Sequence, residues 1–102
     1  MSIQKKYPKN KAVCKVTFKV PKQAAQGGKS IRLVGDFNDW DQNATPMKTS
    51  KDGSFMATVE LAPDKEYHFK YLIDETKWEN DWNADKYLQS PIGHWENSVI
   101  VT

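Results

Sequence analysis

The stretch IRLVGDFNDWDQNATP at residues 31–46 decides the fold that we expect for this chain. It begins with an apolar β-forming run that stops at Gly35, a residue that can adopt backbone angles closed to larger residues. Asn38 and Asp39 then favour a tight turn, because their side chains can bond their own backbone. The turn delivers Trp40 into a polar run. Trp40 therefore either lies at the rim of a functional site or folds back over one end of the core.

Apolar and polar residues alternate on both sides of this stretch, over residues 12–20, 55–61 and 67–74. Such alternation is typical of strands with one buried face. Turn signals such as Pro21 and Asp52-Gly53 separate the runs, and no helical periodicity exceeds one turn. The pattern predicts an all-β protein, an antiparallel β-sandwich of six or seven short strands. The polar passage at residues 79–90 is a candidate functional loop.

The first part of the chain is unusually basic. Residues 1–35 hold eight lysines and Arg32 but no acid, whereas the rest holds six lysines against thirteen acids. This asymmetry fits an anionic partner, or lysines that protect an edge strand from aggregation. We expect no nucleic-acid partner, because only Tyr7 interleaves with the lysines. Residues 1–11 are expected to form a flexible lysine-rich tail, and residues 12–102 a single domain.

Length and composition exclude several classes of protein. At 102 residues the chain is one domain, well short of the ~250 residues of a catalytic β/α barrel. No window approaches the ~20 apolar residues of a membrane span, and no apolar segment resembles a signal peptide, so we expect a cytoplasmic protein without a membrane partner. Cys14, the one cysteine, is expected in the core. With only His68 and His94 beside it, we expect no metal site and no cofactor.

Nothing in the sequence singles out catalytic residues. Acid pairs are inevitable among thirteen carboxylates, but no two are marked as a pair held across a cleft, as glycosidase chemistry needs. No nucleophile-elbow or phosphate-binding motif is present. We therefore expect a binding protein and not an enzyme.

The aromatic residues suggest what is bound. Trp40 and Trp78 both lie beside polar turns, and two flat indoles at a rim suit the apolar face of a pyranose ring. Lys70 falls on the face of its strand opposite the core residues, so its ammonium can reach sugar hydroxyls. His94, Glu96 and Asn97 could add hydrogen bonds. Such a site would bind in the micromolar to millimolar range, at roughly 0.5–1.5 kcal/mol per aromatic contact and about 1 per hydrogen bond.

Nearly the whole chain resembles one known family. The series that carries the resemblance comprises LVGDFNDW at 33–40, TPM at 45–47, DGSF at 52–55, YHFKYLID at 67–74, WEND at 78–81 and ENSV at 96–99. It is similar to the isoamylase N-terminal (early-set) domain, the family 48 carbohydrate-binding module, which includes the glycogen-binding domain of AMP-activated protein kinase β subunits. The resemblance implies an immunoglobulin-like antiparallel β-sandwich of about seven short strands. It also implies non-catalytic binding of α-1,4-linked glucans such as glycogen, starch or maltooligosaccharides.

The resemblance also implies site residues. The two stacking tryptophans of the family fall on Trp40 and Trp78, and its contacting lysine on Lys70. Its loop leucine, threonine and asparagine fall on Ile92, His94 and Glu96, with Asn97 as the alternative for the asparagine. Strand alternation places the first three of these together and favours Glu96 as the sugar neighbour.

The roles of two further tryptophans stay open, and so do two alternative functions of the chain. Trp82 and Trp95 are either further binding platforms or core residues. Strand alternation directs Trp95 away from His94 and Glu96, which favours the core for Trp95. The main alternative function is a protein-docking or regulatory module with a weak or lost sugar site. It would serve a glucan-metabolising enzyme or kinase, and the chain is expected to act alone or with such an enzyme in trans. Binding of an anionic polymer by the basic segment would instead depend steeply on salt.

Overall fold

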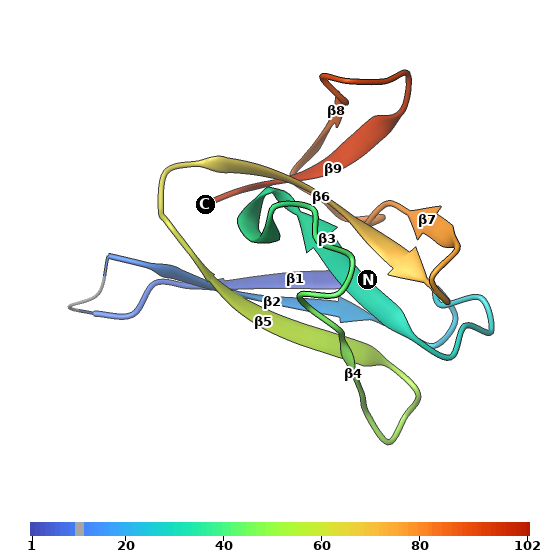
Figure 1. The fold of residues 1–102 in the computed structure, drawn as a ribbon. Coiled ribbons are helices and arrows are strands. Elements are labelled where there is room, and N and C mark those ends of the chain that lie inside the picture. The colour runs from blue at the N-terminus through green and yellow to red at the C-terminus, as the bar shows by residue number, and fades with distance from the viewer. Residues whose placement is uncertain (10–11) are drawn as a thin grey trace.

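Two antiparallel β-sheets pack face to face in the computed structural model, which describes residues 1–9 and 12–102 (Figure 1). The elements are β1 (Ser2–Lys6), β2 (Cys14–Val20), β3 (Ile31–Gly35), the 3₁₀ turn η1 (Asp36–Asn38), β4 (Lys48–Thr49), β5 (Phe55–Leu61), β6 (Glu66–Ile73), β7 (Lys77–Glu79), β8 (Lys86–Gln89) and β9 (Glu96–Val101). The all-β sandwich is confirmed. There are more strands than the expected seven. One reason is that β1 lies in the segment expected to be a tail, residues 1–11, and β8 in the segment expected to be a loop, residues 79–90. Within the described ranges, no helix has the length and apolar character needed to cross a membrane.

The core lies between the sheets and is built from alternate residues of facing strands. Val16 and Phe18 of β2 and Phe69 and Tyr71 of β6 are fully buried there. Phe69 packs edge-on against both neighbouring rings, with centroids 5.1 Å from Phe18 and 5.8 Å from Tyr71. Cys14 is a buried free thiol in the same cluster, as predicted. These contacts leave the opposite faces of β2 and β6 outside the core.

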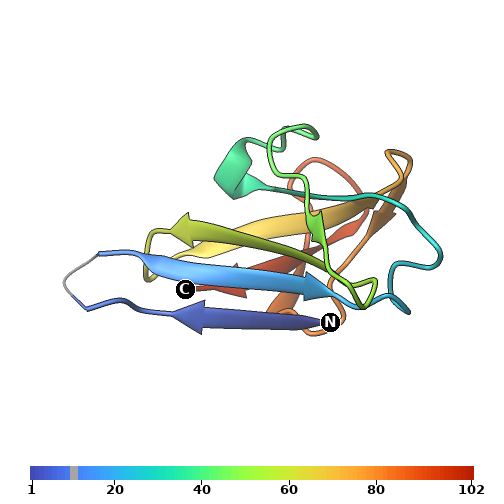
Figure 2. The same ribbon diagram turned by 90° about the horizontal axis from the view of Figure 1, so that it is seen from below.

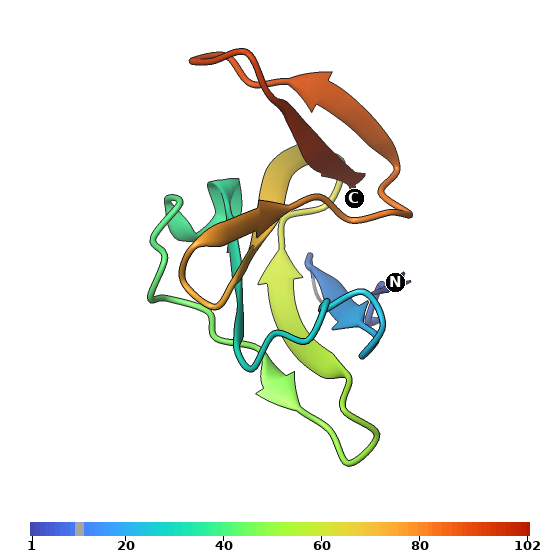
Figure 3. The same ribbon diagram turned by 90° about the vertical axis from the view of Figure 1, so that its right-hand side faces the viewer.

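One sheet has the strand order β1-β2-β5-β4, and the other is built on β6. β3 pairs with one edge of β6 over residues 69–73. On the other edge, β9 pairs with residues 66–69 and β7 with residues 71–73. β8 pairs with β9, and Figures 1 and 3 show this hairpin projecting beyond the rest of the sheet. Three separate segments therefore converge on β6.

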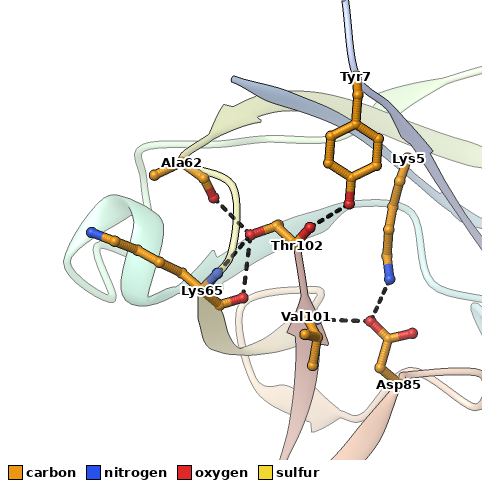
Figure 4. Close-up of polar contacts among 7 residues, drawn as sticks. All are labelled: Lys5, Tyr7, Ala62, Lys65, Asp85, Val101 and Thr102. Atoms are coloured by element: carbon orange, nitrogen blue, oxygen red, sulfur yellow. Dashed lines mark hydrogen bonds and ion pairs between the residues drawn. The ribbon is translucent and has the colours of Figure 1, made fainter. Parts of the chain in front are cut away.

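The structure differs from the expected tail at residues 1–11. Ser2–Lys6 form β1, which pairs with β2 at the outer edge of its sheet (Figure 2); residues 10 and 11 lie outside the described residues. Figure 4 shows the contacts of this segment with the end of the chain. The Tyr7 hydroxyl donates to the Thr102 carbonyl, and Nζ of Lys5 lies 2.7 Å from Oδ2 of Asp85. Ile3 is the only apolar residue in β1, so a strand held largely by backbone bonds gave no hydrophobic signal.

Candidate functional site

The turn after β3 is shaped by one amide side chain. Asn38 accepts a hydrogen bond at Oδ1 from the Gly35 backbone N–H at 3.0 Å. Its Nδ2 donates to the Leu33 carbonyl at 2.9 Å and to Oγ1 of Thr45 at 3.0 Å. A Cβ on residue 35 would lie 2.6 Å from the carbonyl oxygen of His68, so only glycine lets this part of β3 approach β6 so closely. Gly35 and Asn38 therefore explain why the chain turns where the sequence predicts a turn.

Trp40 leaves this turn in an unusual backbone conformation. Asp39 and Trp40 both have positive φ, 58° and 57°, which is rare for a side chain as large as an indole. The Trp40 backbone N–H donates to the Gly35 carbonyl at 2.9 Å. Its indole Nε1 donates to Oδ1 of Asp36 at 2.8 Å, and Oδ2 of the same carboxylate accepts from the His68 backbone N–H at 2.8 Å. The half-buried indole is thus tied to β6 through Asp36.

The pairing of β6 places Lys70 and Trp78 on one face. Trp78 of β7 lies opposite Leu72, and Val34 of β3 lies opposite Lys70. Alternate residues of a strand share a face, so all four side chains lie on the face of β6 that points away from the core. Lys70 and Trp78 are therefore neighbours on the outside of the sandwich.

The β8–β9 hairpin brings a third tryptophan to this face. Val99 lies opposite His68, so Val99, Asn97 and His68 share the outer face of the sheet. Trp95 precedes Asn97 by two residues and is 48% exposed. Its indole lies so close over Gly93 that a Cβ added there would lie 2.0 Å from the ring. Gly93 therefore leaves the room that this position of the indole needs.

Asn80 ties the segment that follows Trp78 to the strand that follows Trp95. Its Nδ2 donates to the Glu96 carbonyl at 3.1 Å. Its Oδ1 accepts from the Ser98 backbone N–H at 3.0 Å and from the Ser98 hydroxyl at 2.9 Å. These bonds link the β7 and β9 segments that carry Trp78 and Trp95.

Trp40, Lys70, Trp78 and Trp95 line one hollow of about 420 Å³. This volume is within the range of small-ligand pockets. Trp78 is 42% exposed, and its indole and the two others give the hollow mainly apolar walls. Three flat apolar surfaces beside one ammonium suit a ligand that has both an apolar face and polar edges, as a pyranose does.

Lys70 supplies the positive charge of this hollow. Burial lowers the pKa of its ammonium below the usual value, and the negative charges of Glu79 and Glu96 oppose that shift. Among residues 1–9 and 12–102, no carboxylate forms an ion pair with Lys70. The ammonium can therefore donate hydrogen bonds to a ligand.

A second hollow of about 440 Å³ adjoins the first and shares two of its indoles. It is lined by Asp36, Trp40, His68, Ser90, Pro91, Ile92, Trp95 and Asn97. Asn97 is 2% exposed, and its Nδ2 lies 3.1 Å from Nδ1 of His68. Its buried Oδ1 has no hydrogen-bond partner among the described residues. This hollow is therefore more polar in its lining than the first.

The residues expected from the sequence fall into three groups. Trp40, Lys70 and Trp78 come together in the first hollow. Ile92 and Asn97 lie in the second hollow, with Trp40 between the two groups. His94 and Glu96 line neither hollow, although the charge of Glu96 acts on Lys70.

Trp95 is not a core residue, contrary to what its parity favoured. Trp95 and Glu96 do lie on opposite faces, as neighbouring residues of a strand do. The face that Trp95 shares with Asn97 is nevertheless the outer face of the sheet, which holds both hollows. Trp82 is exposed and lines neither hollow; its backbone N–H donates to the sulfur of Met1 at 3.0 Å. Asp36 and His68 were not singled out from the sequence as site residues; their only signal was that they lie in the LVGDFNDW and YHFKYLID stretches of the resemblance.

Within the described parts of the chain, no group of three His, Cys, Asp or Glu side chains is arranged to hold a metal ion. The described linings of the two hollows also contain no pair of carboxylates, because Asp36 is the only acidic residue in them. Asp36 accepts hydrogen bonds from the Trp40 indole and the His68 backbone N–H. The arrangement is thus one of flat apolar walls with a few hydrogen-bonding groups.

Comparison of the sequence with known proteins identifies one family. The family model described as the glycogen recognition site of AMP-activated protein kinase matches residues 19–102. The 1,4-alpha-glucan branching enzyme GlgB of Aquifex aeolicus is 40% identical over 52 residues, 50% of this chain and 8% of that enzyme. The 5'-AMP-activated protein kinase subunit beta-2 of Homo sapiens is 29% identical over 77 residues, 76% of this chain and 26% of that subunit. The chain thus spans about a quarter or less of the length of these relatives.

Proposed function

Because the chain belongs to the family of glycogen-recognition domains, which are non-catalytic carbohydrate-binding modules, we propose that its ligand is an α-1,4-linked glucan. Glycogen, starch and maltooligosaccharides share this linkage. The observation that carries the proposal is the convergence of Trp40, Trp78 and Trp95 around Lys70 in one hollow. Indole faces stack on the apolar faces of glucose rings, and the ammonium donates to hydroxyls at their edges.

Each contact of this kind is weak. Roughly 0.5–1.5 kcal/mol per aromatic contact and about 1 kcal/mol per hydrogen bond give dissociation constants in the micromolar to millimolar range for one short oligosaccharide. A polymer that presents many equivalent chain ends or segments raises the apparent affinity per polymer particle, because one module can bind at any of these sites. Glycogen is therefore the form of ligand to which we expect the tightest association.

Titration with maltoheptaose, followed by calorimetry and tryptophan fluorescence, tests the proposal. We expect saturable binding, and an affinity about twofold to tenfold lower in Trp40→Ala and in Trp78→Ala, since 1.4 kcal/mol corresponds to a factor of ten. Trp82→Ala is the matched control, because it removes an exposed indole that lines neither hollow. Absence of any saturable change at millimolar maltoheptaose, with the fold retained, would refute the proposal and favour the alternative of a docking module.

We further propose that the module serves a glucan-metabolising enzyme or a kinase in trans. The support is that one relative is named as a 1,4-alpha-glucan branching enzyme and others as kinase subunits. Adding the module to a branching enzyme that lacks such a domain should raise turnover on glycogen and leave turnover on short maltooligosaccharides unchanged. Equal turnover with and without the module on both substrates would contradict the proposal that the module serves such an enzyme.

A further inference from the structure

β8 is an open edge of the sheet that carries the two hollows. It pairs on one side with β9, and no strand in the part of the chain that the structure describes pairs with its other side. Figures 1 and 3 show the β8–β9 hairpin projecting beyond the rest of this sheet, and residues 87–89 are all exposed. The unpaired backbone of an edge strand is a template for a further strand.

The other edges of the two sheets are covered or protected. Residues 45–47 run along β3 and exchange backbone hydrogen bonds with it. β1 carries two lysines, and β4 and β7 are only two and three residues long. Lysines and short length are common protections of an edge strand. β8 by contrast is regularly paired and has no proline, and its one charged residue, Lys86, forms an ion pair with Glu66.

The hydrogen bonds of the hairpin show which backbone groups of β8 face outward. The Ser90 backbone N–H donates to the Trp95 carbonyl at 2.8 Å, which continues the register of β8 with β9 by one pair. Backbone groups in an antiparallel ladder alternate between the two sides of a strand. Leu88 therefore bonds toward β9, as Ser90 does, and Tyr87 and Gln89 present their N–H and C=O groups at the free edge.

This edge is complementary to itself. When two copies pair antiparallel about a two-fold axis at Leu88, Tyr87 of each copy lies opposite Gln89 of the other, and these two pairs exchange four backbone hydrogen bonds. The Leu88 side chains, each 38% exposed, meet at the centre. Lys86 of each copy lies opposite Ser90 of the other, so no like charges face each other. The partner that this edge fits is a second copy of the chain.

We propose that two copies of the chain pair along β8 and join their sheets into one. Leu88 lies opposite Asn97 and therefore on the outer face of the sheet. A two-fold axis perpendicular to the sheet keeps the outer faces of both copies on the same side, so the hollows of both copies open in the same direction. The advantage of this pairing rests on the proposed function, because one glucan polymer can then engage both copies and the second contact is intramolecular.

The pairing is weak in the absence of a polymer. An edge of four residues is small beside the interfaces of stable complexes, which bury about 1,200–2,000 Å² in total. We therefore expect monomers in dilute solution and pairing where a glucan polymer holds many copies close together.

Disulfide formation in Leu88→Cys tests the pairing and its register. The two Cα atoms of a non-hydrogen-bonded pair lie about 4.5 Å apart, a distance that a disulfide can span. Gln89→Cys is the matched control, because its two cysteines would stand two residues apart along the strands, which is too far for a disulfide. Under mild oxidation on glycogen, Leu88→Cys should crosslink at least about fivefold faster than Gln89→Cys. Wild type should not crosslink, because Cys14 is buried.

Gln89→Pro provides a second test, because proline lacks the outward N–H that the pairing uses. Added to Leu88→Cys, it should slow crosslinking on glycogen to the rate of Gln89→Cys, whereas Gln89→Ala, which keeps the N–H, should not. Both changes should leave the affinity for maltoheptaose unchanged in calorimetry, since residue 89 lines neither hollow.

Equal crosslinking rates for Leu88→Cys and Gln89→Cys would overturn the inference, and so would an undiminished rate after Gln89→Pro is added. Failure of the proposed function looks different, because wild type would then bind no maltoheptaose. In that event the same two cysteine variants, compared at millimolar protein without glycogen, still decide whether β8 pairs with a second copy.

Discussion

The indole nitrogen of Trp40 donates a 2.8 Å hydrogen bond to Oδ1 of Asp36, the first residue of the turn that carries the tryptophan. The second oxygen of that carboxylate accepts from the His68 backbone N–H on β6. One side chain thus fixes the orientation of the indole and joins the turn to the sheet that bears Lys70. The shape of both hollows depends on this link, since Trp40 lines both.

Asp36→Ala should weaken maltoheptaose binding without touching an indole. The change removes two hydrogen bonds to a carboxylate at the surface, so we expect the free energy of unfolding to fall by about 1–2 kcal/mol and the affinity by about threefold to tenfold. Urea denaturation and calorimetry measure the two effects. Glu60→Ala, at an exposed carboxylate on β5, is the control and should change neither. Wild-type affinity in Asp36→Ala would show that the indole needs no such support.

Asn80→Ala should loosen the link between the segments of Trp78 and Trp95. Ser98 is buried, so its backbone N–H would lose its acceptor away from water, at a cost of about 1–3 kcal/mol in the free energy of unfolding. Chemical denaturation measures this cost. Asn43→Ala is a matched control, because Asn43 is exposed and bonds only to other surface groups. Equal stability of the two variants would contradict the role assigned to Asn80.

Gly93→Ala should displace the Trp95 indole, because the new Cβ would lie 2.0 Å from the ring where it now stands. We expect the affinity for maltoheptaose to drop toward that of Trp95→Ala. A double-mutant cycle gives a sharp check, since Gly93→Ala should have almost no further effect once Trp95 is alanine. Additive losses of affinity would mean that Gly93 acts independently of Trp95.

Stability should fall in acid, and Asp74 should account for part of the loss. Its Oδ1 accepts from the backbone N–H groups of Lys29 at 2.8 Å and Ser30 at 3.0 Å, and these bonds lower the pKa of the carboxyl group. A folded-state pKa below the unfolded value of about 3.9 gives stability that is present above that value and is lost as the pH falls through the folded pKa.

The measurement is the urea midpoint between about pH 6 and pH 2. Asp74→Asn should be less stable than wild type at neutral pH but lose less stability across this range. Asparagine is the suitable replacement because residue 74 has a positive φ of 50°, which asparagine tolerates. Parallel pH profiles for the two proteins would exclude a contribution of Asp74.

The parts of the fold that were predictable are those with strong alternation. β2, β5 and β6 were confirmed, since each has one face in the core, as Phe18 and Phe69 illustrate. β1 was not predictable, because its stability comes from backbone pairing and from contacts with residues about 80 or more positions away, such as that of Lys5 with Asp85. Composition carries no information about such contacts.

The candidate site shows the same limit. The neighbourhood of Lys70 and Trp78 follows from strand register, and the outward position of Trp40 from turn chemistry. Trp95 was misjudged because β9 turns Asn97 outward and Ser98 inward, and two small polar residues do not reveal which of them faces the core. His68 went unrecognised because its role depends on its contact with Asn97, which lies 29 positions away.

The left-handed backbone at Asp39 and Trp40 bears on the thermodynamics of ligand capture. Since folding already holds that conformation and Asp36 already holds the indole, a sugar meets a preorganised wall and little further conformational entropy is lost on contact. Encounter then needs no slow rearrangement of this turn. A module built in this way can release one carbohydrate segment and engage the next quickly, which suits a ligand that presents many equivalent segments.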